Sequence, residues 1–295
     1  MSREWVVGRG SRVVTRIRII EVGPRDGLQS ISAFVPTAAK VAYIDALSET
    51  GLTDIEVSSF VSPRWVPQLA DAEEVFARIE RRAGVRYHAL VPNLQGLERA
   101  VSARADVVAV FTAASETFSR KNTNASIADT LERFAPVIAA SPVPVRGYVS
   151  TAFSCPFEGP VAPERVRQVV IALAALGCRE ISLGDTIGRA TPDQVRALLD
   201  LVLVDIAVER IALHCHDTFG QALTNVLAAA ELGVQAFDSS AGGIGGCPYA
   251  PGAPGNISTE SLVRAFPGAT GVVPARLATA SSSMTTAIHA SGTTL

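Results

Sequence analysis

The sequence predicts an α/β fold, a (β/α)8 TIM barrel, and three observations support this prediction. Short apolar segments with the character of strands alternate with longer segments of helical spacing, and eight such pairs fit into about 250 residues. The strand segments are apolar without strict alternation, as is typical of parallel strands buried on both faces. No Gly-x-Gly-x-x-Gly motif opens the first helix, which disfavours an open dinucleotide-binding sheet. Eight units therefore favour a closed barrel.

Local signals place the elements in order. The expected strands comprise residues 16–23, 54–60, 85–91, 107–112, 145–151, 180–183, 210–216 and 234–239. The expected helices comprise residues 37–49, 72–82, 94–104, 126–140, 163–176, a helix opening at 191–192, and then 221–232 and 258–266. Gly51, Gly84 and Gly177 follow helices as stop signals, and Thr191-Pro192 forms an N-cap followed by a first-turn proline.

The helical and strand patterns divide the chain into three parts. Residues 1–15 form an N-terminal arm, residues 16–267 the barrel, and residues 268–295 a short C-terminal extension. The pattern is lost after Phe266, and the Ser/Thr/Ala-rich stretch from Ala278 onward is compatible with either a helix or a loose tail.

Composition and charge exclude several classes of protein. A chain of 295 residues with 48% hydrophobic and 18% charged residues is not disordered. Its net charge of −2 argues against nucleic-acid binding, and no apolar run is long enough to cross a membrane. Four widely spread cysteines predict no disulfides. We read the Arg-rich N-terminus as an arm, not as a targeting peptide, and expect a bacterial-type cytoplasmic protein.

Unusual polar residues gather where the expected strands end. Arg25 and Asp26 follow the first strand, and Asp185 follows the sixth. Glu56 lies within the second strand, and His214 and His216 lie near the end of the seventh. Because the active sites of such barrels lie at the carboxyl ends of the strands, these residues are candidates for one site.

The His-Cys-His segment predicts a metal site. Alternate side chains of a strand share a face, so both imidazoles should point into the barrel mouth while Cys215 points away into the core. The other ligands must come from nearby strand ends, where Asp26 and Asn256 offer oxygen atoms. Two nitrogens with oxygen ligands suit Mg²⁺ or Mn²⁺ better than a closed structural zinc.

Two further features carry candidate chemistry. Arg25 and Asp26 could form a plain ion pair, but neighbouring side chains of an extended segment diverge. We therefore expect separate tasks, with Arg25 facing an anionic oxygen. Residues 242–255 hold six glycines and three prolines around Cys247, which predicts a mobile lid with a reactive thiol. Cys155 and Cys178 are expected to be ordinary buried thiols.

Eight segments resemble the hydroxymethylglutaryl-CoA lyase family. They are EVGPRDGLQ (21–29), EVSSFVSPRWVPQLAD (56–71), LVPNLQGLE (90–98), SETFSRKNTNAS (115–126), GYVSTAFSCPFEG (147–159), ISLGDTIGRATP (181–192), LHCHDTFGQAL (213–223) and AGGIGGCPYAPGAPGNISTE (241–260). The RDG and HxH elements are shared by a wider group of metal-dependent Claisen-type enzymes, whereas the glycine-rich loop is far more specific to the lyases. The match departs after Phe266, which leaves the far end of the acyl pocket and the subunit contacts open.

The resemblance implies a retro-Claisen cleavage of 3-hydroxy-3-methylglutaryl-CoA to acetyl-CoA and acetoacetate, as in leucine degradation and ketone-body formation. It implies that Asp26, His214, His216 and Asn256 bind the metal, with Asp26 and His214 also catalytic, that Arg25 stabilises the enolate and that Cys247 donates the proton. Glu56, Asp185 and Tyr148 match substrate-binding positions near the reacting centre. A homodimer is also implied.

Several alternatives stay open at this point. A lyase of the same family could act on another 3-hydroxy-3-alkylglutaryl-CoA or a related acyl-CoA, and a condensing synthase is less compatible with the cysteine loop. A Schiff-base aldolase needs a lysine on a strand, whereas Lys40 falls in a helix and Lys121 in a loop. A barrel that only binds partners, without catalysis, would not need to retain every motif residue.

Overall fold

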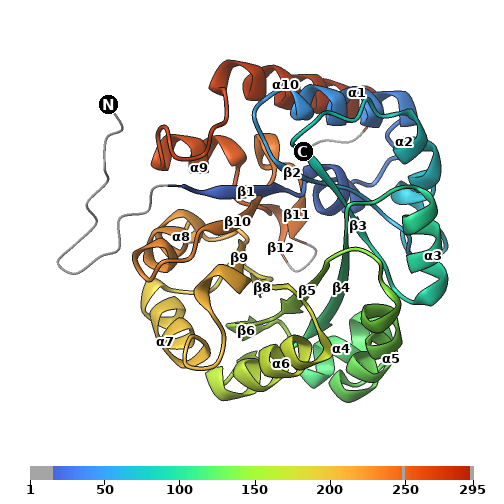
Figure 1. The fold of residues 1–295 in the computed structure, drawn as a ribbon. Helices are drawn as coiled ribbons and strands as arrows, with labels where there is room; N and C mark the ends of the chain where they lie inside the picture. The colour runs from blue at the N-terminus through green and yellow to red at the C-terminus, as the bar shows by residue number, and fades with distance from the viewer. Residues whose placement is uncertain (1–15, 248–249, 293–295) are drawn as a thin grey trace.

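The computed structural model describes residues 16–247 and 250–292, and it confirms the predicted (β/α)8 barrel (Figure 1). The expected N-terminal arm, residues 1–15, lies outside the described residues. Eight strands close into a ring in which every neighbouring pair is parallel, in the order β1-β10-β9-β8-β5-β4-β3-β2. The barrel strands are β1 (Arg18–Glu21), β2 (Asp54–Ser59), β3 (Arg86–Leu90), β4 (Val107–Ala113), β5 (Val145–Ser150), β8 (Glu180–Asp185), β9 (Ile211–Cys215) and β10 (Ala236–Ser239).

Helices surround the barrel and bury their apolar sides against it (Figure 1). They are α1 (Thr37–Ser48), α2 (Ala72–Arg78), α3 (Leu94–Ser102), α4 (Glu116–Thr123), α5 (Ile127–Ala140), α6 (Pro163–Leu176), α7 (Pro192–Val202), α8 (Ala222–Glu231), α9 (Thr259–Ala265) and α10 (Pro274–Ala290). Thr191 caps α7 through a reciprocal capping box with Gln194, as the Thr-Pro signal predicts. α4 was not expected from the sequence pattern.

The C-terminal region is helical where the sequence left a helix and a loose tail open. α10 lies beside α1 (Figure 1), and its larger apolar side chains, Leu277, Met284 and Ile288, are fully buried. Arg276 donates a hydrogen bond to the Glu49 carbonyl at the end of α1. The many small residues of α10 allow close packing, so a stretch that reads as patternless becomes part of the outer layer.

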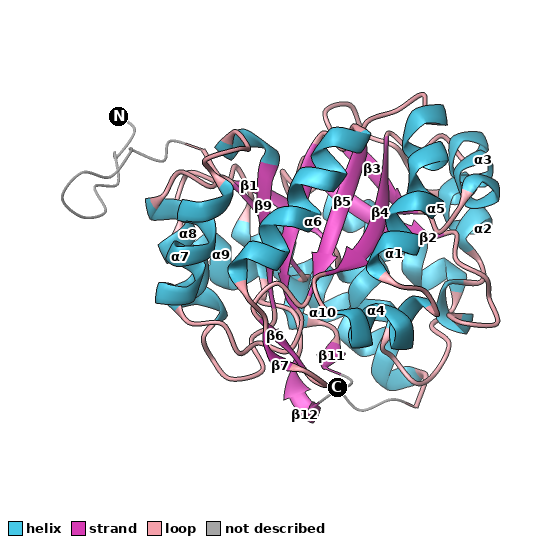
Figure 2. Cartoon of the chain, turned by 90° about the horizontal axis from the view of Figure 1, so that it is seen from below, coloured by secondary structure: helices cyan, strands magenta, loops and turns pink. Residues whose placement is uncertain are grey.

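Two short hairpins stand at the end of the barrel to which the strands point (Figure 2). One pairs β6 (Ser154–Cys155) with β7 (Gly159–Pro160), and the other pairs β11 (Gly246–Cys247) with β12 (Ala250–Pro254). The glycine-rich segment expected as a mobile lid therefore contains an antiparallel strand pair. This end, with the residues that follow the strands, is called the mouth below.

Candidate metal and catalytic site

A tight turn after β1 carries the first two candidate residues. Residues Gly23–Gly27 form a single π-helical turn, in which the Gly23 N–H donates to Glu21 Oε1 at 2.9 Å. A Cβ at position 23 would lie 2.7 Å from both this oxygen and Tyr43 Oη, so only glycine fits there. The turn presents Arg25 and Asp26 at the mouth.

The expectation that Arg25 and Asp26 diverge is wrong. The Arg25 Nη1 donates a hydrogen bond to Asp26 Oδ1, because the two residues lie in a π-helical turn and not in an extended segment, where neighbouring side chains point to opposite sides. Arg25 Nε also donates to Glu56 Oε2 at 2.6 Å. The guanidinium is thus clamped between two carboxylates, which fixes its direction at the mouth.

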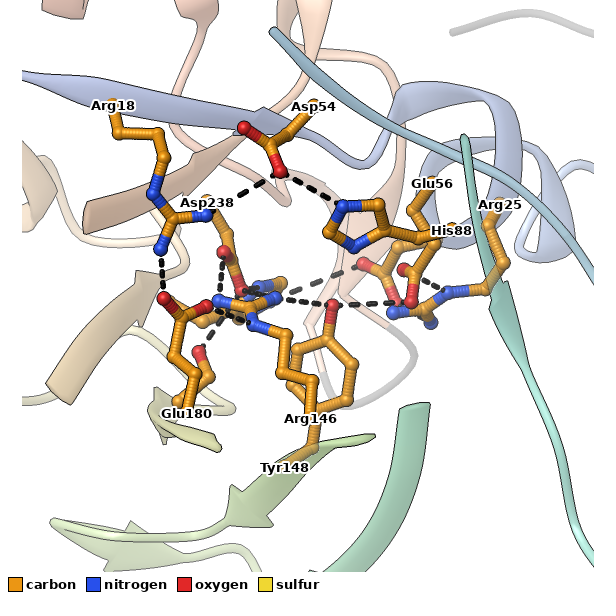
Figure 3. Close-up of polar contacts among 12 residues, drawn as sticks. Arg18, Arg25, Asp54, Glu56, His88, Arg146, Tyr148, Glu180 and Asp238 are labelled. Carbon is orange, nitrogen blue, oxygen red and sulfur yellow. Dashed lines mark hydrogen bonds and ion pairs between the residues drawn. The ribbon is translucent and has the colours of Figure 1, made fainter. Parts of the chain in front are cut away.

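Glu56 and Tyr148 form a chain of hydrogen bonds that holds Arg25 from inside the barrel. Glu56 is fully buried, and its second oxygen accepts a hydrogen bond from the Tyr148 hydroxyl at 3.2 Å (Figure 3). The same hydroxyl accepts from Arg146 Nη1 at 2.7 Å. Both residues were expected to bind substrate. Their polar atoms take part in a network that holds Arg25, and their expected contact with substrate stays a prediction.

Asp26 meets His214 of β9 and His216, which directly follows this strand, as the strand pattern predicts. One donor atom from each of Asp26, His214 and His216 lies within 4.8 Å of the others, the only such group of three in the described part of the chain. The two imidazole rings are 5.3 Å apart between centroids. Cys215, between them, is buried on the opposite side with 1% exposure, as expected. Cys155 and Cys178 are also buried.

Asn256 completes the group from the foot of the glycine-rich segment. Residues 255–257 bond to the end of β9, with the Ile257 N–H donating to the Cys215 carbonyl at 3.1 Å, and this attachment brings Asn256 to His216. The Asn256 amide nitrogen donates to Asp26 Oδ2 at 2.9 Å. The same amide turned by 180° would present its oxygen to that position.

The protonation states of these groups suit a divalent cation. Burial and the neighbouring His214 lower the pKa of His216 to about 4, so this imidazole is neutral at pH 7. Burial alone would raise the pKa of Asp26, but Arg25 and the histidines lower it to about 2. The buried Nδ1 of His216 has no hydrogen-bond partner among the described residues. Burial alone would lower the pKa of His214, but the hydrogen bond with Asp238 and the charge of Asp26 raise it, so a metal would displace a proton from this imidazole. An ionised carboxylate and a neutral imidazole with an unpaired nitrogen fit a bound metal.

Two other expected site residues have different surroundings. Burial raises the pKa of Asp185 to about 6, and its two oxygens accept backbone N–H groups of Arg189 and Ala190 at 3.0 Å each. This carboxylate therefore holds the loop after β8. Cys247 lies in β11, in the hairpin at the mouth (Figure 2), and its side chain is outside what the structure describes.

Sequence reasoning missed two charged residues inside the barrel. Arg146 on β5 is 1% exposed and donates to both oxygens of Asp238 on β10, at 2.6 and 3.2 Å (Figure 3). Asp238 Oδ2 also lies 3.2 Å from His214 Nδ1. Each is a charged residue within an otherwise apolar strand. Because a buried charge is costly without a partner, this pattern could have indicated a buried ion pair.

A cavity of about 680 Å³ opens beside the mouth. The β6–β7 hairpin, the loop after β8 and Phe219 line it, and Arg189 lies with its guanidinium 4.6 Å from the Phe219 ring centroid. None of Arg25, Asp26, His214 and His216 lines this cavity. The cavity and the candidate metal site are therefore neighbouring but separate features.

The fold and the site together define a class of barrel enzyme with a candidate metal centre at the carboxyl ends of its strands. Residues 16–287 match the family model described as HMGL-like. The chain belongs to the HMG-CoA lyase family. It is 53% identical over 250 residues to the rat cytoplasmic 3-hydroxy-3-methylglutaryl-CoA lyase, an alignment that covers 84% of this chain and 73% of the relative. Against the chicken mitochondrial hydroxymethylglutaryl-CoA lyase the identity is 51%, with 84% of each chain covered.

Solved structures agree with this assignment. The HMG-CoA lyase of Brucella melitensis superposes with a TM-score of 0.90 at 49% identity, covering 92% of this chain and 98% of that one. An HMG-CoA lyase from Acinetobacter baumannii, solved in complex with coenzyme A and 3-methylmalate, gives a TM-score of 0.88 at 39% identity, covering 93% and 92%. The carboxyl transferase domain of Rhizobium etli pyruvate carboxylase shares the fold at 18% identity, with a TM-score of 0.72, covering 95% of this chain and 49% of that one.

Proposed function

We propose that this chain cleaves 3-hydroxy-3-methylglutaryl-CoA to acetyl-CoA and acetoacetate by a retro-Claisen reaction that depends on a divalent cation. The observation that carries the proposal is the convergence of Asp26, His214 and His216 beside the clamped guanidinium of Arg25. The names of relatives about 50% identical over most of the chain support it independently.

The reaction assigns distinct tasks to the residues at the mouth. A base takes the proton of the tertiary hydroxyl, the bond between C2 and C3 breaks, and its electron pair moves into the thioester as an enolate. The new ketone is acetoacetate, and a proton delivered to C2 of the enolate gives acetyl-CoA. Asp26, His214, His216 and Asn256 would hold the cation, which when bound would act as a Lewis acid toward substrate oxygens.

Arg25 is the residue that we assign to the developing enolate charge. Its Nε and Nη1 are bonded to Glu56 and Asp26, so its position is set before substrate arrives. A cation held in this way needs no reorganisation as charge develops, and such preorganised groups contribute strongly to transition-state stabilisation.

For the two proton transfers, we assign Cys247 as the donor to the enolate and Asp26 as the acceptor of the hydroxyl proton, with His214 as the acceptor only where its Nε2 does not bind the cation. Asp185 is less suited to the second role because both its oxygens already accept backbone N–H groups. Glu56 and Tyr148 act in this proposal by holding Arg25, so their effect on substrate is indirect.

The metal, the location in the cell and the oligomeric state are assigned from the chemistry of the site and from the relatives. The nitrogen and oxygen donor set favours Mg²⁺ or Mn²⁺ over a closed structural zinc. Within the described residues no helix is long and apolar enough to cross a membrane. The rat relative named as a cytoplasmic lyase supports our inference of a cytoplasmic location, and we retain a homodimer as part of the proposal.

A panel of thioesters tests the proposal directly. Purified protein would be incubated with 3-hydroxy-3-methylglutaryl-CoA and with 3-hydroxy-3-alkylglutaryl-CoA homologues, with and without Mg²⁺ or Mn²⁺. Acetyl-CoA and acetoacetate in equal amounts, released fastest from the methyl substrate, are the expected result. Faster cleavage of a longer homologue would favour the alternative lyase, and no cleavage of any thioester would refute the reaction.

A further inference from the structure

The imidazole of His214 is fixed by a hydrogen bond on the side that faces away from Asp26. Its Nδ1 lies 3.2 Å from Asp238 Oδ2, and its Nε2 lies 4.0 Å from Asp26 Oδ2. His216 differs, because its Nδ1 has no hydrogen-bond partner among the described residues. Of the two candidate histidine ligands, His214 is therefore the one that a carboxylate orients.

The barrel register places Asp238 beside His214. In the parallel pairing of β10 with β9, Asp238 is the direct partner of His214, and both side chains point into the barrel. Asp238 is 1% exposed, so its carboxylate has no bulk solvent around it. The contact is therefore built into the strand pairing itself and does not depend on a surface loop.

Besides His214, two groups hold the Asp238 carboxylate in place. Arg146 donates to both of its oxygens, and the Ser182 hydroxyl donates to Oδ2 at 3.0 Å. Arg146 is held in turn by Glu180, at 2.7 Å from its Nε, and by Tyr148 (Figure 3). Because the supports are themselves bonded, the position of Asp238 is determined on several sides.

The charge of Asp238 decides the direction of its bond to His214. Arg146 donates to both oxygens of Asp238, at 2.6 and 3.2 Å, and this two-point contact with a guanidinium holds the carboxyl in its ionised form. An ionised carboxylate only accepts, so His214 Nδ1 carries the proton and donates it. In the neutral imidazole the lone pair is then on Nε2, the atom on the Asp26 side.

We propose that Asp238 is a positioning residue that fixes the ring orientation and the tautomer of His214 for metal binding, with Arg146 and Ser182 holding Asp238 in place. This inference rests on the proposed metal site. Carboxylates that accept a hydrogen bond from a ligating histidine typically contribute 10- to 100-fold to metal affinity. The alternative is that Asp238 only neutralises the buried Arg146.

The test is to measure Mn²⁺ binding to the full chain by electron paramagnetic resonance of the free ion. Asp238→Asn should weaken Mn²⁺ binding by about 10- to 100-fold. The matched control is Asp54→Asn, because Asp54 is an equally buried aspartate bonded to His88 Nε2 at 2.9 Å and to arginines. The control should bind Mn²⁺ within about twofold of wild type, although both variants lose a His–Asp pair. Equal Mn²⁺ affinity in Asp238→Asn and wild type would overturn the proposal.

A double-variant comparison separates positioning from general damage. If Asp238 acts through His214, then His214→Ala and His214→Ala/Asp238→Asn should bind Mn²⁺ equally weakly. A further loss in the double variant would show that Asp238 acts by another route. Should Asp238→Asn fail to fold, Arg146→Gln/Asp238→Asn leaves no unpaired buried charge and must show the same loss of Mn²⁺ affinity.

The same measurements distinguish this inference from the proposed function. Wild type that binds Mn²⁺ but releases no acetyl-CoA would refute the reaction and leave the Asp238 comparison valid. Wild type that binds no Mn²⁺ or Mg²⁺ would refute the metal site and the positioning role together.

Discussion

The two ends of the barrel interior are built from the same residue types and are arranged for different purposes. At the amino ends of the strands, Arg18, Asp54, Arg86 and Glu180 are each the first residue of a strand. Asp54 forms ion pairs with Arg18 and Arg86. Glu180 forms ion pairs with Arg18 and Arg146 (Figure 3). Each carboxylate there has cationic partners within reach.

The mouth arranges its charges around a common point instead. Asp26, His214 and His216 bring three donor atoms within 4.8 Å of one another, a grouping that the described residues show nowhere else. Each end has a buried histidine nitrogen that finds no hydrogen-bond partner among the described residues, Nδ1 of His88 and Nδ1 of His216. Only at the mouth does such a histidine belong to a convergent set of donors. The types of residue present therefore do not distinguish a structural cluster of charges from a ligand site. The convergence of donor atoms on one point does.

The largest expected effect is the loss of activity on metal removal, because only the mouth is expected to bind a metal. Chelation should abolish activity, and added Mg²⁺ or Mn²⁺ should restore it. His216→Ala should weaken Mn²⁺ binding by at least about 100-fold, because it removes a ligand and not merely a group that supports one. Activity and isothermal titration with Mn²⁺ measure both effects. Full turnover in a chelator-dialysed sample would contradict the assignment of the mouth.

Cys247→Ala should fold and bind Mn²⁺ like wild type but turn over about 10²- to 10⁴-fold more slowly, the usual range for a lost general acid. Cys247 should also be the thiol most readily alkylated, since Cys155, Cys178 and Cys215 are buried. Substrate should protect it when the loop closes. Peptide mapping of alkylation and the turnover of the variant are the measurements. Near wild-type turnover with unprotected labelling would exclude this thiol from the mechanism.

Arg25→Met should lower kcat by about 10²- to 10³-fold with little change in KM, because the lost interaction is made mainly with charge that develops in the transition state. Steady-state kinetics at saturating Mn²⁺ separates the two constants. A variant with nearly normal kcat and a raised KM would make Arg25 a substrate-binding residue only.

Asp54→Asn should change stability and leave the chemistry intact. It removes a buried acceptor of Arg18, Arg86 and His88, so we expect a loss of about 1–3 kcal/mol in the free energy of unfolding, with activity within about twofold of wild type. Urea denaturation and the acetyl-CoA assay check the two parts. A large loss of activity in a folded variant would mean that the two ends are coupled.

The acid stability of the Asp54→Asn variant provides a further check on the charge cluster at the amino ends of the strands. Burial alone would raise the pKa of Asp54, but the hydrogen bond with His88 and the charges of Arg18 and Arg86 lower it below its ordinary value. A depressed pKa stabilises the fold above the unfolded-state value, near 4, and this contribution is lost as the pH falls below it. Asp54→Asn should therefore lose less stability than wild type between about pH 5 and pH 2.

Local patterns were sufficient for the barrel and for most of the mouth. Alternation of apolar runs with helical spacing depends on short-range physics, so the eight strands and the α7 cap could be predicted. Likewise, the i, i+2 spacing of His214 and His216 places two imidazoles on one face of a strand whatever the rest of the chain does. Where local geometry departs from these patterns, as in the π-helical turn, the Arg25–Asp26 pairing was predicted wrongly.

The sequence by itself thus determined the fold class and the strand ends where polar residues gather, because both follow from periodicity along the chain. Only the tertiary structure decided which charges meet. Asp238 reaches His214 and Arg146 across 24 and 92 positions of sequence, and Glu21 accepts a hydrogen bond from Thr259 across 238. Such pairings depend on strand register around a closed ring and on the desolvation that forces each buried charge to find a partner, and neither is a property of any local segment.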